Sequence, residues 1–117
     1  EAGAYLGQAL EQAREIGDPE VEGLALGHLG ELHANQGRTE EARAVFDAAE
    51  RLLCNVSVNG LGQVLAARAI AEHHAGDAAR ANAAFRRAEQ IAGQTAAGPD
   101  SALGHALARA AALLGSE

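Results

Sequence analysis

The residues best suited to chemistry in this chain are its histidines and its single cysteine. His73 and His74 are adjacent, and neighbours on a helix point about 100° apart, so these two imidazoles cannot readily chelate one metal ion. Cys54 follows Leu52-Leu53 at an expected helix end, which favours a small buried apolar residue over a nucleophile. The spacing suggests no metal-ligand cluster, catalytic triad or complete phosphate-binding loop. The sequence therefore predicts no metal, no cofactor and no enzymatic activity.

The composition restricts the kind of partner. The chain has 117 residues, a net charge of −7, 16 acidic residues, nine arginines and no lysine. This acidic balance argues against nucleic acid and against anionic lipid. No apolar run is long enough to span a membrane, no signal peptide is expected, and one cysteine fits a reducing compartment. We therefore predict a cytoplasmic protein, and the absence of lysine beside abundant alanine, arginine and glycine suggests a bacterial source.

Glycines divide the chain into helical segments. Gly37, Gly76 and Gly115 recur at intervals of 39 residues, and Gly17 follows a further helical pattern. Each is predicted to end a helix in the left-handed conformation that glycine adopts at low cost. The sequence thus predicts six helices, the first over residues 2–16 and the last ending near residue 114.

Helix starts are predicted from capping residues. Asp18, followed by proline, and Asp77 are expected N-caps, Thr39 is expected to cap the third helix, and Ser57 can cap the fourth. Two turns are predicted as well, one at Asn59-Gly60 and a longer loop from Gly93 to Pro99. The last helix is expected to open at Pro99-Asp100.

A second pattern repeats with the same period. The motif Ala42-x₃-Phe46-x₂-Ala49 returns 39 residues later as Ala81-x₃-Phe85-x₂-Ala88. A fixed period of this size is typical of stacked supersecondary units. The predicted fold class is therefore all-α, an α-solenoid of about six helices in antiparallel pairs, in which small residues let paired helices approach closely.

These motifs resemble the tetratricopeptide repeat. The segment Leu26-x₂-Leu29-Gly30-x₂-His33 matches the first helix of that family, with His33 where an aromatic residue is usual, so His33 is expected to pack in the interior. Arg68 stands where a leucine is usual, and the period is 39–40 residues rather than 34. The resemblance covers the whole chain as one domain, residues 1–117, with a partial repeat at 1–17, repeats at 18–56 and 57–97, and a terminal capping helix at 98–117.

The resemblance also implies a binding surface, because the first helix of each repeat in this family lines a concave groove. The polar residues carried over to that face are Glu31, Asn35, Gln63, His73, His74, His105 and Arg109, and its smaller or apolar residues are Leu24, Gly27, Ala34, Ala66, Ile70, Ala102 and Ala112. Some members hold a C-terminal carboxylate with lysines and asparagines. This chain has Glu31 and Ile70 at those positions, so that mode of binding is not expected.

The function expected from the resemblance is a non-catalytic protein–protein interaction or scaffolding module. Its longer repeat resembles arrays in large bacterial signalling proteins, of which this chain would be a fragment. Two alternatives remain open. In the first, the segment is a ligand-sensing part of a multidomain ATPase, cyclase, kinase or transcriptional regulator. In the second, it is a module that forms a homodimer through Tyr5, Leu6 and Leu10 of its first helix.

Overall fold

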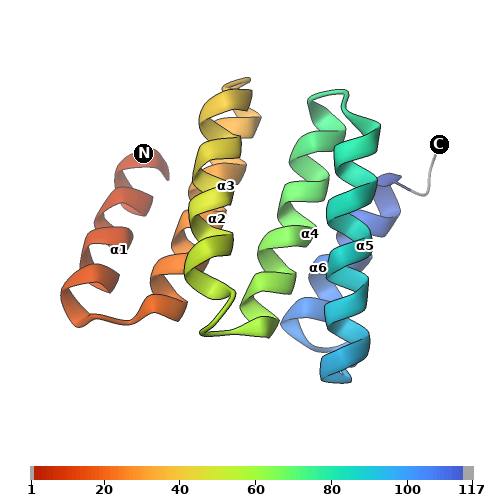
Figure 1. The fold of residues 1–117 in the computed structure, drawn as a ribbon. Helices are drawn as coiled ribbons and strands as arrows, with labels where there is room; N and C mark the ends of the chain where they lie inside the picture. Colours follow the sequence, from red (N-terminus) through yellow and green to blue (C-terminus); the bar gives the residue numbers. More distant parts are fainter. Residues whose placement is uncertain (1, 115–117) are drawn as a thin grey trace.

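The computed structural model describes residues 2–114, with the side chains of residues 7, 8 and 10–114. All of the secondary structure in this range is helical (Figure 1). The six helices are α1 (Ala2–Ile16), α2 (Pro19–Asn35), α3 (Thr39–Leu53), α4 (Val58–His74), α5 (Ala78–Thr95) and α6 (Ala102–Leu114). The predicted all-α class is thus confirmed for the described residues.

The turns between the helices use the predicted glycines. Gly17, Gly37 and Gly76 have φ angles of 77°, 77° and 85°, in the left-handed region that penalises residues with a Cβ atom. The carboxylate of Asp18 accepts hydrogen bonds from the backbone N–H groups of the first turn of α2, and Asp77 does the same at α5. Gly115 lies outside the described residues.

Several predicted boundaries are wrong by a few residues. Thr39 is the first residue of α3, and Arg38 is its N-cap without a side-chain hydrogen bond. Asn59-Gly60 lies in the first turn of α4, because Ser57 caps the helix just before it by accepting from the Gly60 N–H. A cap so close to an Asn-Gly pair makes the pair part of the helix rather than a turn.

The loop before α6 also starts later than predicted. Helix α5 continues through Gly93 to Thr95, and Ala96 ends it in the left-handed conformation with a φ of 54°. Helix α6 begins only at Ala102, after Pro99-Asp100, and the Ser101 hydroxyl accepts from the backbone N–H of Gly104. Polar backbone groups at this end are therefore satisfied by Ser101 rather than by an aspartate cap.

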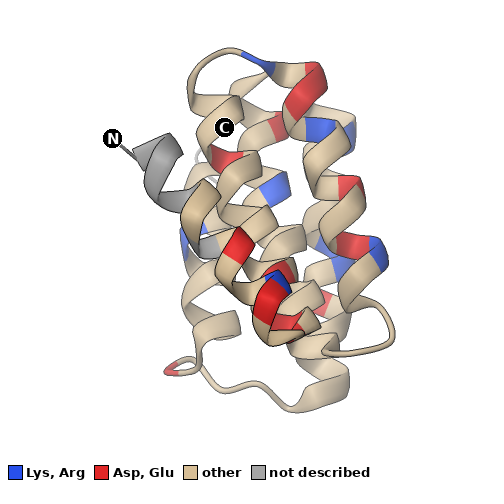
Figure 2. Cartoon of the chain, turned by 90° about the vertical axis from the view of Figure 1, so that its left-hand side faces the viewer, with Lys and Arg blue, Asp and Glu red and all other residues tan. Residues whose placement is uncertain are grey.

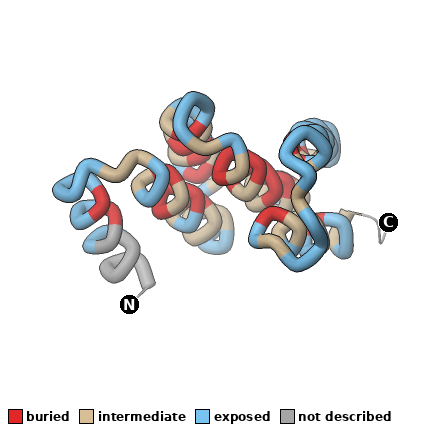
Figure 3. The backbone as a smooth tube through the Cα atoms, turned by 90° about the horizontal axis from the view of Figure 1, so that it is seen from below, coloured by how far each residue is buried: buried red, intermediate tan, exposed pale blue. Residues whose placement is uncertain are grey.

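Helix α4 lies at the centre of the molecule. It packs against α2, α3, α5 and α6, whereas α1 packs against α2 (Figure 1). Buried positions face the spaces between neighbouring helices, and exposed positions lie on the outer sides (Figure 3). The side chains of Tyr5 and Leu6, on which the predicted homodimer depends, lie outside the described residues, while Leu10 is buried.

Close packing between α2 and α3 depends on a glycine. A Cβ atom built on Gly30 would lie only 2.9 Å from the ring of Phe46, so any larger residue would push the two helices apart. Phe46 is 1% exposed and is among the largest fully buried side chains. Phe85, at the same position of the second copy of the sequence motif, is only partly buried. The two copies of the Ala-x₃-Phe-x₂-Ala motif therefore have the same aromatic residue with different degrees of burial.

Two further predictions about single residues have different outcomes. His33 is partly buried, as expected for a packing residue, and its Nδ1 atom is buried with no hydrogen-bond partner in the part of the chain that the structure describes. Cys54 is exposed, which contradicts the prediction of a buried residue. It follows the end of α3, where the chain turns toward α4, and its thiol donates to the carbonyl oxygen of Arg51 at 3.2 Å.

Candidate binding groove

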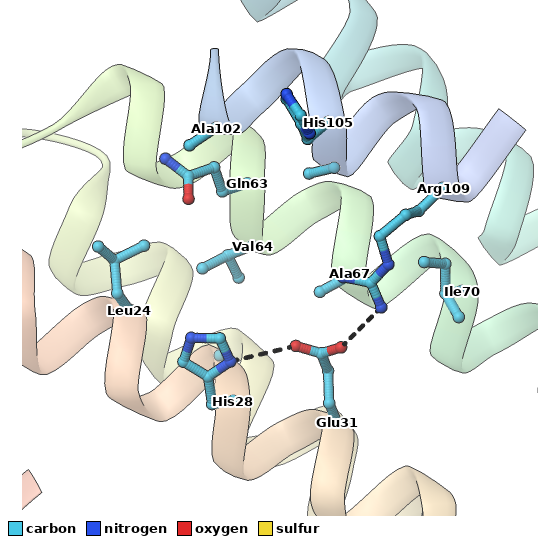
Figure 4. A pocket seen from close by; sticks show the side chains of 12 residues that line it. Leu24, His28, Glu31, Gln63, Val64, Ala67, Ile70, Ala102, His105 and Arg109 are labelled. Atoms are coloured by element: carbon cyan, nitrogen blue, oxygen red, sulfur yellow. Dashed lines mark ion pairs between the residues drawn. The ribbon is translucent and has the colours of Figure 1, made fainter. Parts of the chain in front are cut away.

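One groove is shared by three helices that are not consecutive in the sequence. It has a volume of about 300 Å³ and lies over α4, with α2 on one side and α6 on the other (Figure 4). We call this surface the groove. Its lining consists of Leu24, Gly27, His28 and Glu31 from α2, Gln63, Val64, Ala67 and Ile70 from α4, and Ala102, His105, Ala106 and Arg109 from α6.

The floor of the groove is apolar and closely packed. Val64, which is 2% exposed, lies at its centre beside Ala67 (Figure 4). A Cβ atom on Gly27 would lie 3.0 Å from a methyl group of Val64, so the glycine brings α2 close to α4 at this point. An apolar floor of this kind favours contact with an apolar group of a ligand, since that contact removes apolar surface from water.

The polar residues of the groove converge on one carboxylate. Glu31 Oε1 lies 3.5 Å from Nδ1 of His28, and Glu31 Oε2 lies 3.7 Å from Nη2 of Arg109 (Figure 4). His28 belongs to the same helix as Glu31, whereas Arg109 belongs to α6. In the described structure α2 and α6 do not pack directly against each other. The Glu31–Arg109 pair therefore links two helices across the groove.

This ion pair is loose. The side chain of Arg109 is 67% exposed, and its 3.7 Å separation from Glu31 is longer than a hydrogen bond. Pairs of this kind are screened by water and contribute little to stability. The charges at the mouth of the groove are thus available to a ligand at small cost.

His28 titrates differently from a free histidine. Its hydrogen bond and charge interaction with Glu31 raise the pKa of His28 above the ordinary value of 6.5, against the opposing effects of partial burial and of Arg109. The imidazole is accordingly protonated over a wider pH range in the folded protein than in an unfolded chain.

Four of the seven predicted polar residues come together in the groove, namely Glu31, Gln63, His105 and Arg109. Asn35, His73 and His74 lie outside its lining. Asn35 is exposed at the last residue of α2, and His74 faces a second, smaller cavity where α4 approaches the turn between α2 and α3. The last turn of α4 therefore extends past the groove.

The predicted apolar lining residues are also found in different places, and only some of them line the groove. Leu24, Gly27, Ile70 and Ala102 line the groove, whereas Ala34 lines the second cavity and Ala112 is exposed elsewhere on α6. Ala66 is completely buried. Val64 and Ala67 line the groove instead of Ala66. The face of α4 that points into the groove is therefore rotated about the helix axis relative to the prediction.

His28 is the main residue that the prediction missed. It precedes Glu31 by three residues, and a spacing of three places two side chains on the same side of a helix. That spacing was a usable signal. The family pattern places other positions on the groove face, so His28 falls outside the lining that it predicts.

The opposite side of α4 carries a different kind of polar structure. Two nitrogens of the Arg43 guanidinium on α3 donate to the carboxylate of Glu72, Nε to Oε1 at 3.3 Å and to Oε2 at 3.0 Å, and Nη2 to Oε1 at 2.8 Å. Glu72 is 3% exposed. Glu72 is the largest cause of the raised pKa of Arg43. Arg43 also pairs with Glu40 and Asp77. Basic and acidic residues are interspersed on the helices in Figure 2.

A second cluster continues this side of the molecule. Arg68 on α4 donates to Asp47 and Glu50 of α3, and Glu50 also pairs with Arg87 of α5 at 3.1 Å. Burial opposes the charge on Arg68, but these hydrogen bonds outweigh it and raise its pKa. The guanidinium lies over the ring of Phe46, 5.9 Å from its centre. We call these two clusters together the ion-pair face.

Two kinds of feature are absent from the described residues, a metal-binding cluster and a membrane-spanning helix. No group of three or more His, Cys, Asp and Glu side chains among them could hold a metal ion. Nor does any helix there have the length and apolar character needed to cross a membrane. Comparisons with protein-family models, curated proteins and solved structures found no match.

Proposed function

We propose that this chain is a non-catalytic protein–protein interaction module that binds a peptide segment of a partner in the groove. The observation that supports it most strongly is the shape of the lining, which joins three helices over an apolar floor with polar side chains at the rim. Binding sites commonly combine an apolar surface with a few polar groups that set the orientation of the ligand.

We further propose that the six helices form a tetratricopeptide-like solenoid of antiparallel helix pairs. The short glycine turns and the packing of Gly30 on Phe46 support this assignment. In such an arrangement α2, α4 and α6 are the first helices of successive repeats. Their contribution to one groove is what this arrangement would produce.

The experiment is a selection of peptides from a random display library on the immobilised chain, followed by mapping of the bound site. Amide chemical shifts of the ¹⁵N-labelled protein are recorded with and without the selected peptide. We expect the largest changes at groove residues such as Ala67 and Ile70. Changes confined to other surfaces would contradict the proposal.

A matched pair of variants tests the location independently. Ala67→Trp fills the groove, because Ala67 lies in its floor. Ala79→Trp adds the same side chain to an exposed position of α5 outside the groove. We expect the first variant to lose peptide binding and the second to retain it. Equal binding by both would place the ligand elsewhere.

A ligand-sensing role is the second candidate, and the Glu31–Arg109 pair favours it. Because this pair links α2 to α6 across the groove, a ligand that separates the two side chains would change how these helices are held. A ligand-induced change in the distance between α2 and α6, measured with spin labels on the two helices, would support sensing over simple docking.

A further inference from the structure

Glu31 pairs with the guanidinium of Arg109, a cation that a ligand carboxylate could otherwise bind. Arg109 carries five N–H donors, its side chain is 67% exposed, and its contact with Glu31 is too long for a hydrogen bond. A carboxylate that enters the groove can approach the same guanidinium and form two parallel hydrogen bonds, which is the stronger arrangement. Glu31 and such a carboxylate would compete for Arg109.

Release of Arg109 does not leave Glu31 without a partner. Its other oxygen lies 3.5 Å from His28, one turn away on the same helix. The side chain of Glu31 is 27% exposed, so water also reaches it. Exchange of Arg109 from Glu31 to a ligand therefore needs no isolated buried charge, which would be the main obstacle.

The charges of the lining are more favourable to an acidic ligand than those of the rest of the molecule. The groove contains one arginine, Arg109, and one carboxylate, Glu31, so its formal charge is zero when histidines are counted as neutral. The whole chain has a net charge of −7. The groove is thus less acidic than the rest of the molecule, and this contrast would direct an acidic segment to it.

From these contacts we infer that the groove binds a partner peptide through an acidic side chain, and that Glu31 is an internal competitor for that carboxylate. The ligand carboxylate pairs with Arg109 beside His105, and an adjacent apolar side chain of the ligand rests on Val64 and Ala67. This inference depends on the proposed function, because it specifies the ligand of the same groove.

The test uses three pools of fluorescent heptapeptides, blocked at both ends so that no terminal charge remains. The pools share randomised apolar flanks and carry glutamate, glutamine or lysine at the centre. Binding to the full chain is measured by fluorescence anisotropy. We expect the glutamate pool to bind more tightly than the glutamine pool, and the lysine pool to bind most weakly.

Variants at the two members of the pair should have opposite effects on the glutamate pool. Arg109→Gln should weaken its binding about tenfold, as expected for a lost charge-assisted hydrogen bond, and remove the preference over glutamine. Glu31→Gln should tighten it about two- to fivefold, the range of an exposed ion pair that no longer competes. Arg86→Gln, which removes the same charge from the exposed side of α5, is the control and should change nothing.

The possible failures are distinguishable. If all pools bind equally and Ala67→Trp abolishes binding, the groove binds peptides but the inferred acidic specificity is wrong. If Glu31→Gln weakens the glutamate pool, Glu31 assists the ligand and is not a competitor. A preference for the lysine pool would assign recognition to Glu31 itself. If no pool binds, both the inference and the proposed function fail.

Discussion

The two sides of α4 carry ion pairs of opposite character. On the ion-pair face, Glu72 is 3% exposed and is held by hydrogen bonds from two nitrogens of Arg43. In the groove, Glu31 meets Arg109 at 3.7 Å, with most of the arginine in water. Both pairs join different helices. The difference teaches that a link between helices can be structural or exchangeable, depending on burial and geometry.

Burial decides which of the two pairs can be broken without damage to the fold. Separation of Arg43 from Glu72 would leave a carboxylate without its hydrogen bonds in a position that little water reaches, and such groups are costly. Separation of Arg109 from Glu31 exposes both groups to water. We therefore expect mutations on the ion-pair face to change stability and mutations in the groove to change binding.

The largest effect is expected in the core beneath the ion-pair face. Phe46→Ala should lower the free energy of unfolding by about 3–5 kcal/mol, since Phe46 is fully buried against Gly30 and beneath Arg68. Urea denaturation followed by circular dichroism measures it. Phe85→Ala, at the same position of the second Ala-x₃-Phe-x₂-Ala motif, should cost less because Phe85 is only partly buried. Equal costs would contradict the difference in burial between the two phenylalanines.

The next effect concerns the ion-pair face itself. Arg68→Met keeps much of the side chain's bulk but removes the hydrogen bonds to Asp47 and Glu50. We expect a loss of about 1–2 kcal/mol in the free energy of unfolding, after allowance for the water that reaches Asp47. Peptide binding in the groove should be unchanged. A variant as stable as the original chain would show that the network contributes no net stability.

Stability should respond little to the same kind of change in the groove. Arg109→Gln should alter the free energy of unfolding by less than about 0.5 kcal/mol, because the pair that it removes is exposed and loose. The measurement is the same urea titration as for Arg68→Met. A loss comparable to that of Arg68→Met would mean that the groove pair is structural, and the contrast between the faces would fail.

The smallest effect is a pH dependence at His28. Its folded pKa is raised by Glu31, so its contribution to stability is complete below about pH 6.5, the unfolded value, and is lost as the pH rises through the folded pKa. The groups that face it are Glu31 on α2, and Gln63, His105 and Arg109 across the groove. An NMR titration should give a His28 pKa above 6.5, and Glu31→Gln should lower it. An unchanged pKa in that variant would exclude Glu31 as the cause.

Local sequence signals were sufficient to predict the all-α class and most of the helix ends. Gly37 and Gly76 marked helix ends because their positive φ angles are costly for other residues, and Asp18 and Asp77 marked helix starts through caps. The predictions failed where two signals competed. At Ser57, a cap overrode the Asn-Gly turn signal two residues later, and Gly93 was tolerated inside α5.

The groove was harder to predict because it depends on how helices are rotated about their axes. On α6 the predicted residues His105 and Arg109, one turn apart on one face, both line the groove. On α4 a small rotation buries Ala66 and brings Val64 and Ala67 to the floor. His74 was misplaced because the last turn of its helix meets the α2–α3 turn, a tertiary contact with no local signal. Exposure of Cys54 likewise depends on the path of the chain after α3.

The exposed thiol of Cys54 has a practical consequence. It is the single cysteine of the chain, and it is absent from the lining of the groove. A maleimide dye would therefore attach at one known position, without any mutation and without obstructing the ligand. Because the chain has no tryptophan to give a strong intrinsic signal, this natural attachment point offers a direct optical readout of the unmodified sequence.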